Sequence, residues 1–382
     1  MRKDKPSALY LHIPFCKHKC YYCDFNTYAV QGQPVDAYLN ALEREMRLTG
    51  ETYPPPVIET IFVGGGTPTI LEPEQMKRFL AAIPRYFPVW SPALEFTMEA
   101  NPGTTDERKL QVMREGGVNR ISFGAQSFDN GLLRRIGRIH EADEIATSVR
   151  KAKDAGFGNL SIDLMFGLPG QTLKQVRDSV ERALELELTH YSLYSLKVEE
   201  NTLFHTLFQR GELPLPEEEE EAAMYETIIE MLTAAGYVQY EISNFAKPGY
   251  ESRHNMKYWL NHSYYGVGAG AHGYVNGVRH ENVKGVKDYI AAAQRGLPVQ
   301  ASAAVDDDEA MEDFMMVGLR LLRGVSDRDF RAQFDRSMED VFGKEIARLV
   351  SEGLLERTPD GCRLTRQGLL LGNEVFARFI RA

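Results

Sequence analysis

Six strand-like segments alternate with helical segments in the N-terminal half of the chain, and this alternation restricts the fold more than any other feature. The strand candidates are 8–13, 57–63, 94–98, 119–123, 160–166 and 191–198. The helical stretches between them are 74–86, 106–115, 142–155 and 173–187. Such a pattern is typical of βαβ units and a parallel sheet. Six units predict an α/β fold with an open, partial (β/α)6 barrel, whose chemistry lies at the carboxyl ends of the strands.

The C-terminal part of the chain has a different pattern. Residues 301–308 are small and acidic and predict a linker, whereas 273–278 carry an Asn-Gly hairpin signal. Helices are expected at 311–322, 327–334 and 338–351. A hairpin around the turn at 359–361 follows them, which suggests a small winged-helix-like domain. We therefore expect a barrel domain with an extension over 1–300 and a helical, winged-helix-like domain over 301–382.

Composition excludes several classes of protein. The chain has 382 residues and a formal charge of −10, which argues against nucleic acid as the main partner. No apolar run approaches the length of a membrane span, and the N-terminus does not resemble a signal peptide. Four cysteines are too few for a disulfide scaffold and indicate a reducing compartment. We expect a cytoplasmic protein.

Three of the four cysteines, Cys16, Cys20 and Cys23, lie within eight residues of one another, directly after the first strand candidate. Thiolates of this kind hold iron–sulfur clusters, and a set that is one ligand short leaves an iron free to bind a small molecule. Structural zinc is an alternative, although it normally takes four protein ligands. Chance core cysteines are another, but the run around them is polar, basic and aromatic. The fourth cysteine, Cys362, is most simply a half-buried strand residue.

Polar or glycine residues stand at several strand ends. The run Gly64–Gly66 follows the second strand candidate, where missing side chains would let the backbone approach a ligand. A plain strand-to-helix turn is the alternative. Glu99 ends the third strand candidate and could pair with a ligand cation or cap a helix. Asp163 lies inside an otherwise apolar strand, where a charge needs a partner.

The C-x3-C-x2-C spacing, with the aromatic Tyr22 before the last cysteine, resembles the signature of radical S-adenosylmethionine (SAM) proteins. Proteins of that family carry a [4Fe-4S] cluster in a partial βα barrel, and the methionine part of SAM chelates the open iron. The resemblance implies that Cys16, Cys20 and Cys23 hold the cluster. It also implies a SAM site formed by Tyr10, Gly65, Gly66, Thr67, Glu99, Gln126, Arg138, Asp163 and Tyr194.

The resemblance also implies roles within that SAM site. The glycine run would meet the amino group of SAM, as the corresponding motif does in the family. Asp163 would accept hydrogen bonds from the ribose hydroxyls. Arg138 would pair with the SAM carboxylate. Without the resemblance, Arg138 would pass for an ordinary surface arginine.

The segment 10–16, Tyr-Leu-His-Ile-Pro-Phe-Cys, and the C-terminal domain resemble the oxygen-independent coproporphyrinogen III oxidase group over nearly the whole chain. That group contains dehydrogenases of heme synthesis and related heme chaperones. The dehydrogenases have a further cysteine two residues after the triad, where this chain has Phe25. The segment 254–259, His-Asn-Met-Lys-Tyr-Trp, matches the HNxxYW motif of the chaperone branch. Both features point away from the dehydrogenase.

The resemblance therefore implies a heme chaperone that binds the cluster, SAM and heme and delivers heme to acceptor proteins. Whether SAM is cleaved, and hence whether the protein is an enzyme, stays open. So do homodimer formation and transient membrane association. The alternative is oxidative decarboxylation of coproporphyrinogen III by a dehydrogenase. A nucleic-acid-modifying radical enzyme that docks through the winged domain is a third class, which the acidic charge disfavours.

His254 has two interpretations. Imidazole is a common axial ligand of heme iron, and Tyr258 and Trp259 could pack on a porphyrin face. Alternatively, this segment closes the open side of the barrel and His254 makes a structural hydrogen bond. His272 is a weaker heme candidate. The glycines at 266–270 lack the strand-to-helix context of a dinucleotide site.

Overall fold

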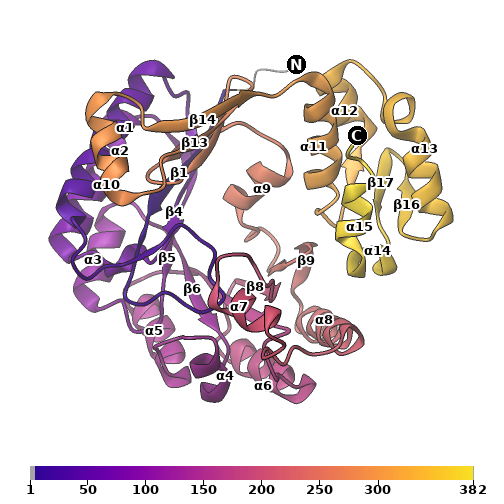
Figure 1. Ribbon diagram of the computed structural model, residues 1–382, viewed down its shortest axis with the longest axis horizontal. Helices are drawn as coiled ribbons and strands as arrows, with labels where there is room; N and C mark the ends of the chain where they lie inside the picture. The colour runs from indigo at the N-terminus through magenta and orange to yellow at the C-terminus, as the bar shows by residue number, and fades with distance from the viewer. Residues whose placement is uncertain (1–4, 382) are drawn as a thin grey trace.

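A single large sheet dominates the computed structural model, which describes residues 5–381 (Figure 1). Its twelve strands follow the order β14-β13-β12-β11-β1-β4-β5-β6-β7-β8-β10-β9. Their bounds are β1 (Ala8–Ile13), β4 (Ile58–Gly65), β5 (Trp90–Ala100), β6 (Arg120–Gln126), β7 (Asn159–Phe166), β8 (His190–Ser195), β9 (Val238–Glu241), β10 (Asn244–Ala246), β11 (Tyr264–Val267), β12 (His272–Val275), β13 (Val278–Asn282) and β14 (Val299–Ala304). Strands β1, β4, β5, β6, β7 and β8 pair in parallel in chain order, which confirms the partial (β/α)6 barrel.

Helices cover the outer face of the parallel strands (Figure 1). They are α1 (Val35–Thr52), α2 (Pro73–Tyr86), α3 (Glu107–Glu115), α4 (Asn130–Arg135), α5 (Ala142–Asp154) and α6 (Leu173–Leu184). The sequence analysis did not predict α1, although Tyr38, Leu42 and Met46 recur at helical spacing and are fully buried. A short 3₁₀ helix, η1 (Pro68–Ile70), precedes α2. After α6 come α7 (Leu203–Gln209), α8 (Glu218–Ala234), α9 (Arg253–Trp259) and α10 (Val286–Arg295).

Strands at both ends extend the parallel sheet. Strand β11 joins β1 in parallel, and β12, β13 and β14 continue antiparallel from it. The predicted Asn-Gly hairpin is confirmed between β12 and β13, because Asn276 and Gly277 both have positive φ, 53° and 77°. At the other end β8 pairs antiparallel with β10, and β10 with β9.

The prediction of a linker at 301–308 is wrong. Residues 301–304 complete β14, an edge strand whose side chains are all exposed. Asp306 caps the next helix, α11 (Asp307–Gly318), by accepting from the backbone N–H of Glu309. Small residues tolerate an exposed edge, and acidic residues favour a first helical turn, so the same composition suits a strand and a helix start.

A second core lies in the C-terminal part of the chain. Its elements are α11, β15 (Val325–Ser326), α12 (Asp327–Phe334), α13 (Met338–Ser351), β16 (Leu355–Thr358), β17 (Gly361–Leu364), α14 (Arg366–Leu370) and α15 (Gly372–Ala377). Helices α12 and α13 have the predicted bounds, and β16 and β17 form the predicted hairpin. Cys362 is buried in β17, 1% exposed, rather than half-buried. The predicted boundary at residue 300 falls within β14, and the two-domain division stays a proposal.

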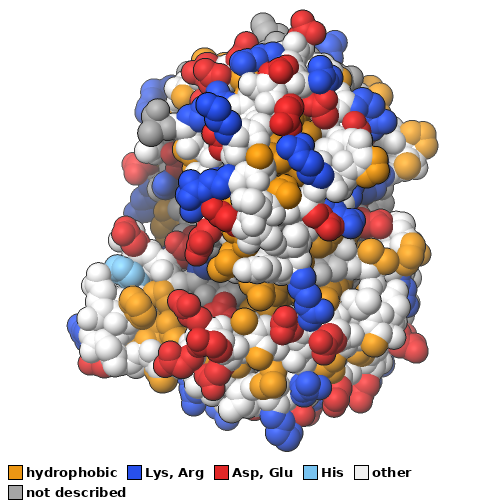
Figure 2. Space-filling model, turned by 90° about the vertical axis from the view of Figure 1, so that its right-hand side faces the viewer, with side chains coloured by type: hydrophobic (Ala, Val, Ile, Leu, Met, Phe, Trp, Pro, Cys, Tyr) orange, Lys and Arg blue, Asp and Glu red, His pale blue; other side chains and the backbone are white. Residues whose placement is uncertain are grey.

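The C-terminal unit is attached to the barrel sheet at β9. The backbone N–H of Leu322 donates to the carbonyl of Tyr240 at 3.1 Å, and that of Ile242 donates to Arg320 at 3.1 Å. Acidic and basic side chains are interspersed on the face formed by this unit and α8 (Figure 2). None of the helices within residues 5–381 combines the length and the apolar character that crossing a bilayer requires.

Glu45 of α1 connects the barrel to the extension of the sheet formed by β11–β14 and to α10 through hydrogen bonds. Its carboxylate is 2% exposed and accepts from Gly268 N–H at 2.8 Å, Asn282 Nδ2 at 2.6 Å and the Tyr289 hydroxyl. These three donors come from the segment after β11, the end of β13 and α10. Burial raises the pKa of Glu45 to about 7, although the three donors oppose this shift.

We expect Glu45→Ala to lower the free energy of unfolding by about 3 kcal/mol or more, because the buried donors on Gly268, Asn282 and Tyr289 would lose their acceptor. Denaturant titration followed by circular dichroism measures this loss. The control is Glu51→Ala, also on α1, whose exposed pair with Arg47 should contribute less than about 1 kcal/mol. Equal losses in the two variants would contradict the anchoring role.

The same carboxyl group gives stability a pH dependence. Its pKa is about 7 in the folded chain against 4.5 for an ordinary Glu, so the folded state binds more protons between these values. Stability contributed by Glu45 should therefore decrease as the pH rises from about 4.5 to about 7. Glu45→Gln should flatten this part of the profile, and an unchanged slope would show that other groups cause it.

Candidate functional site

The cysteine loop is anchored at both ends by two short strands. Strand β2 (Phe15–Cys16) pairs in parallel with β3 (Tyr28–Ala29). The N–H of Tyr28 donates to the carbonyl of Pro14 at 2.8 Å, and that of Val30 donates to Cys16 at 2.8 Å. Because β2 directly follows β1, the loop lies at the carboxyl ends of the parallel strands, where the fold class predicts the chemistry.

All three cysteines of the loop are free and half-buried. The Thr67 hydroxyl donates to Cys16 Sγ at 3.5 Å, and Arg138 Nη1 donates to Cys20 Sγ at 3.6 Å. Cys23 Sγ lies 4.0 Å from Thr27 Oγ1. Burial raises the pKa of Cys16 to about 11, so a thiolate there needs a compensating positive charge.

The donor chemistry of this loop fits an iron–sulfur cluster. Three thiols stand on one short segment, and two of them already receive hydrogen bonds that would stabilise a thiolate. Among residues 5–381, no three or more His, Cys, Asp or Glu side chains converge on a point where they would hold one metal ion. The assignment of Cys16, Cys20 and Cys23 as cluster ligands stays a prediction.

The glycine run packs against the chain's own atoms. A Cβ on Gly65, whose φ is +103°, would lie 2.2 Å from the ring of His12. A Cβ on Gly66 would lie 2.6 Å from the carbonyl oxygen of Phe15. Side chains at both positions would therefore collide with β1 and β2. Close packing of the protein itself thus requires these glycines, in addition to the expected approach of a ligand.

Two acidic side chains meet inside the barrel. Glu99 from β5 accepts from Gly65 N–H at 3.1 Å, and Asp163 from β7 accepts from Ser122 Oγ at 3.0 Å. Burial and the charge of Asp163 raise the pKa of Glu99 to about 8, and burial also raises the pKa of Asp163. The positive charge of the buried Arg120 opposes both shifts. Such a pair favours a cationic ligand, which would allow both carboxyl groups to ionise.

A chain of hydrogen bonds connects two of the cysteines through polar side chains. Arg138 donates to Asn101 Oδ1 at 2.7 Å and to Cys20, and Asn101 Nδ2 donates to Thr67 Oγ1 at 2.7 Å. Thr67 in turn donates to Cys16. The Nε of Arg138 is buried and has no partner within residues 5–381, so one donor remains for a ligand. Asn101, two residues after Glu99, was missed by the sequence analysis.

A cavity of ≈ 550 Å³ opens beside the cysteine loop. Its lining residues are Tyr10, His12, Lys19, Asp24, Phe25, Asn26, Thr27, Tyr28, Gly65, Glu99, Tyr258, Tyr264, Gly270, His272 and Lys284. The cavity thus joins three predicted SAM residues, Tyr10, Gly65 and Glu99. A recess of ≈ 30 Å³ is lined by Thr67 and Arg138, together with Cys20.

The remaining predicted SAM residues line neither space. They are Gly66, Gln126, Asp163 and Tyr194. Gln126 ends β6 with a positive φ of 65°, and its side-chain amide and the Arg138 guanidinium both approach Gly124. Tyr194 near the end of β8 is 40% exposed. All four belong to β6, β7, β8 or the segment after β4, so the structure places them around the same barrel without bringing them into the cavity wall.

His12 is a second site residue that the sequence analysis did not assign. Its Nδ1 lies 2.9 Å from the hydroxyl of Tyr10, and its Nε2 lies 3.0 Å from the carbonyl oxygen of Asn26. Burial lowers the pKa of His12 to about 4, so the ring is neutral near pH 7. The Asn26 side chain donates to the carbonyl of Ala269 at 2.9 Å, which connects the cysteine loop to the β11 side of the sheet.

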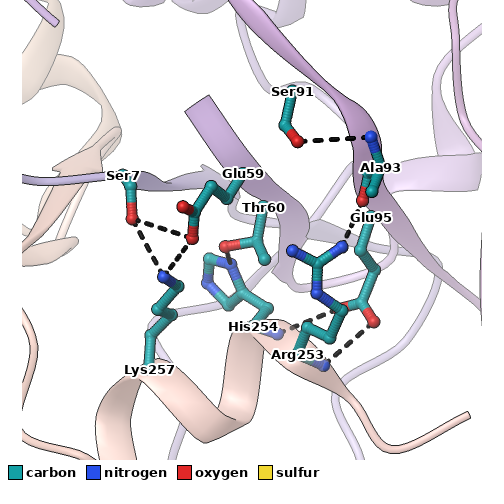
Figure 3. A network of polar contacts seen from close by, with 9 residues as sticks. All are labelled: Ser7, Glu59, Thr60, Ser91, Ala93, Glu95, Arg253, His254 and Lys257. Atoms are coloured by element: carbon teal, nitrogen blue, oxygen red, sulfur yellow. Dashed lines mark hydrogen bonds and ion pairs between the residues drawn. The ribbon is translucent and has the colours of Figure 1, made fainter. Parts of the chain in front are cut away.

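His254 is enclosed between α9 and the amino ends of the barrel strands (Figure 3). Its Nδ1 lies 2.9 Å from Thr60 Oγ1 and its Nε2 lies 2.9 Å from the hydroxyl of Tyr258. Burial lowers the pKa of His254 to about 3. Both ring nitrogens are therefore occupied, and iron ligation would require breaking one of these bonds. This geometry matches the alternative in which the segment closes the barrel.

Polar contacts fix α9 against the sheet. Glu95 of β5 accepts from the backbone N–H groups of Arg253 and His254, both at 2.9 Å, and so caps the helix (Figure 3). Lys257 Nζ contacts Ser7 Oγ at 3.0 Å and pairs with Glu59. Tyr258 of the same helix lines the cavity, so α9 contributes to its wall. His272, the weaker heme candidate, lies on the cavity wall, 3.6 Å from Glu281.

Comparisons with known proteins agree with this geometry. Residues 10–183 match the model of the radical SAM superfamily, and residues 305–371 match the HemN C-terminal domain. "Heme chaperone HemW" of Bacillus subtilis (strain 168) is 49% identical over 98% of this chain and 99% of that protein. The protein of that name from Escherichia coli (strain K12) is 35% identical over 100% of both.

A solved structure resembles nearly the whole chain. Coproporphyrinogen III oxidase (HemN) from Escherichia coli, described as a radical SAM enzyme, superposes with a TM-score of 0.86 at 25% identity. The match covers 98% of this chain and 90% of that one.

Cys20→Ala should abolish the absorbance of a reconstituted [4Fe-4S] cluster and leave the far-ultraviolet circular dichroism unchanged. Cys20 lies on a loop outside the barrel core, and Arg138 is the donor to its sulfur. The control is Cys362→Ala, which removes a thiol buried in the C-terminal unit and should keep the cluster. A full cluster in Cys20→Ala would show that the ligands lie elsewhere.

Glu99→Gln should weaken SAM binding by about tenfold or more without changing the cluster absorbance, because a neutral amide cannot pair with a ligand cation. Near pH 7 the wild-type carboxyl group is protonated, since its pKa is about 8. Binding of a cation lowers that pKa, so a proton should be released. Calorimetry in buffers of different ionisation enthalpy measures the release, which Glu99→Gln should lack and the exposed control Glu107→Gln should retain. Equal proton release in both variants would contradict the pairing.

Proposed function

The chain belongs to the radical SAM superfamily and, within it, to the family of the heme chaperones HemW, and from this we propose that it binds heme and delivers it to acceptor proteins. The observation that carries the proposal is the full-length similarity to the Bacillus subtilis chaperone, 49% identical over 98% of the chain. The radical SAM family implies a [4Fe-4S] cluster and SAM as cofactors. Heme is the cargo. We propose a cytoplasmic location, for which the few free cysteines are the support.

We propose that Cys16, Cys20 and Cys23 hold the cluster and that the polar side chains at the strand ends hold SAM. When bound, the cluster, once reduced, would supply the electron for a reductive cleavage of SAM. Glu99 and Asp163 would balance the positive charge of the ligand, since burial raises the pKa of both carboxyl groups and the charge of Arg120 opposes each shift only in part. The unpartnered Nε of Arg138 would donate to the SAM carboxylate.

The dehydrogenase is the second candidate, because a coproporphyrinogen III oxidase has the same fold with a TM-score of 0.86. Phe25 argues against it. Its ring is 62% exposed and lines the cavity at the position where the resemblance to dehydrogenases requires a cysteine. An apolar ring there can neither ligate iron nor relay a proton.

After anaerobic reconstitution with iron and sulfide, we expect stoichiometric uptake of hemin and its transfer to an apo-hemoprotein, both followed by Soret absorbance. In parallel, coproporphyrinogen III with SAM and a reductant should give no protoporphyrinogen IX. Turnover of coproporphyrinogen without stable heme binding would overturn the proposal in favour of the dehydrogenase. Phe25→Cys is the matched variant for the turnover assay. We expect it to form no protoporphyrinogen IX either, because this chain should differ from the dehydrogenases at more positions than residue 25.

A further inference from the structure

A groove of ≈ 750 Å³ lies on the side of α9 away from the ≈ 550 Å³ cavity beside the cysteine loop. We call the latter the cofactor cavity. It runs between α9, the edge strand β9, the segment 321–323 and β17 of the C-terminal unit. Its lining residues are Glu59, Val238, Gln239, Tyr240, Glu251, Arg253, Met256, Lys257, Leu260, Leu321, Leu322, Arg323 and Arg363. Its volume lies in the range of pockets that enclose drug-sized ligands.

Two opposite faces of α9 serve the two spaces. Tyr258 lines the cavity, whereas Arg253, Met256 and Lys257 line the groove. At 100° per residue, Tyr258 and Met256 point about 160° apart around the helix axis. Figure 3 shows Arg253 and Lys257 on either side of the enclosed His254. A ligand in the groove would therefore be separated from the cofactor cavity by the helix itself.

Apolar side chains form part of the groove wall. Val238 on β9 is 50% exposed at the rim, and Met256, Leu260 and Leu322 are half-buried along the wall. These residues come from three separate parts of the chain, so the apolar surface is concave and not a single helix face. A flat apolar ligand would remove this surface from water.

The net charge of the residues that line the groove is positive, whereas the net charge of the whole chain is negative. Its lining has four basic residues and two acidic ones, an excess of two positive charges on a chain of net charge −10. Lys257 is neutralised by Glu59, and Arg363 pairs with Glu356 at 2.5 Å. Arg323 is exposed and makes no ion pair or hydrogen bond with any residue between 5 and 381. A guanidinium without a partner at the wall of an apolar groove suits a ligand carboxylate.

We propose that this groove binds the heme, with the porphyrin ring on the apolar wall formed by Val238, Met256 and Leu260. One propionate carboxylate would lie at the unpartnered Arg323, and the other at Arg363, where it would replace the half-exposed pair with Glu356. The proposal rests on the proposed function, because heme is the cargo it assumes. A porphyrin with two propionates combines the flat apolar body and the two negative charges that the groove can accommodate. Heme and SAM then occupy separate sites on the two faces of α9 and bind together.

The first test reverses the unpartnered charge. Arg323→Glu should weaken hemin binding by about tenfold or more, measured by Soret titration, because it removes a charge-assisted contact and adds repulsion. The matched control is Arg378→Glu, an exposed arginine of the same C-terminal unit that lies outside the groove, and its affinity should equal that of the wild type. Hemin dimethyl ester should bind the wild type and Arg323→Glu with equal affinity, because it lacks the carboxylates.

The second test addresses the apolar wall. Val238→Glu should lower the hemin affinity, whereas Val299→Glu should not. Both valines are exposed, 50% and 40%, and lie on the two opposite edge strands of the same sheet, so the variants should fold alike. Circular dichroism and the cluster absorbance check the fold in each variant.

The outcomes separate the two proposals. If the wild type binds no hemin, the proposed function fails. If the wild type binds hemin, and the variants Arg323→Glu and Val238→Glu bind it with the same affinity, then heme does not bind in the groove but the proposed function stands. Equal losses in the control variants would show general adsorption and also overturn the groove. Displacement of hemin by saturating SAM would place heme in the cofactor cavity and contradict separate sites.

Discussion

The parallel register between β1 and β4 is the constraint on which the site depends. It sets Ile13 opposite Gly65, so the end of β1 lies directly beside the glycine run. The chain then turns into the cysteine loop, and the N–H groups of Gly66 and Thr67 donate back to Ile13 and Phe15 at 2.9 and 2.8 Å. A side chain at either glycine would push the two segments apart. Strand pairing thus fixes the distance between the thiols of the loop and the hydrogen-bond donors after β4.

The buried charges inside the barrel favour a ligand that carries both a positive and a negative group. Burial and the charge of Asp163 raise the pKa of Glu99 to about 8, because the nearby Arg120 offsets only part of their effect. Arg138 likewise keeps one buried donor, Nε, without a partner among residues 5–381. Unsatisfied groups of this kind reduce stability in the free protein. They become favourable when a molecule with both a positive and a negative group fills the space, and this is the character of the methionine part of SAM.

Sequence patterns predicted the local elements well and the long-range contacts poorly. The strand 8–13 and the helices 327–334 and 338–351 have the predicted bounds, because hydrophobic periodicity and caps are local signals. The prediction of a linker at 301–308 is wrong because residues 301–304 form an edge strand through pairing with β13, which their own composition does not indicate. Asn101 was missed for a similar reason: its function arises from Arg138, 37 residues away in the chain. The spacing of the cysteines predicts a cluster site, which stays a prediction, whereas the enclosure of His254 could be recognised only in the folded structure.

Helix α9 shows how one short element can serve two spaces. Its seven residues are too few for an independently stable helix, so it depends on the Glu95 cap and on the contacts of His254 and Lys257 with the strands. These contacts use Ser7 before β1, Thr60 near the amino end of β4 and Glu95 in the middle of β5, whereas Gly65 and Glu99 lie at the carboxyl ends of β4 and β5. A displacement of the α9 backbone would therefore move Tyr258 at the cavity wall together with Met256 and Lys257 at the groove wall, because a single turn of helix carries all three. The segment that closes the barrel thereby lies between the cofactor cavity and residues 321–323 of the C-terminal unit.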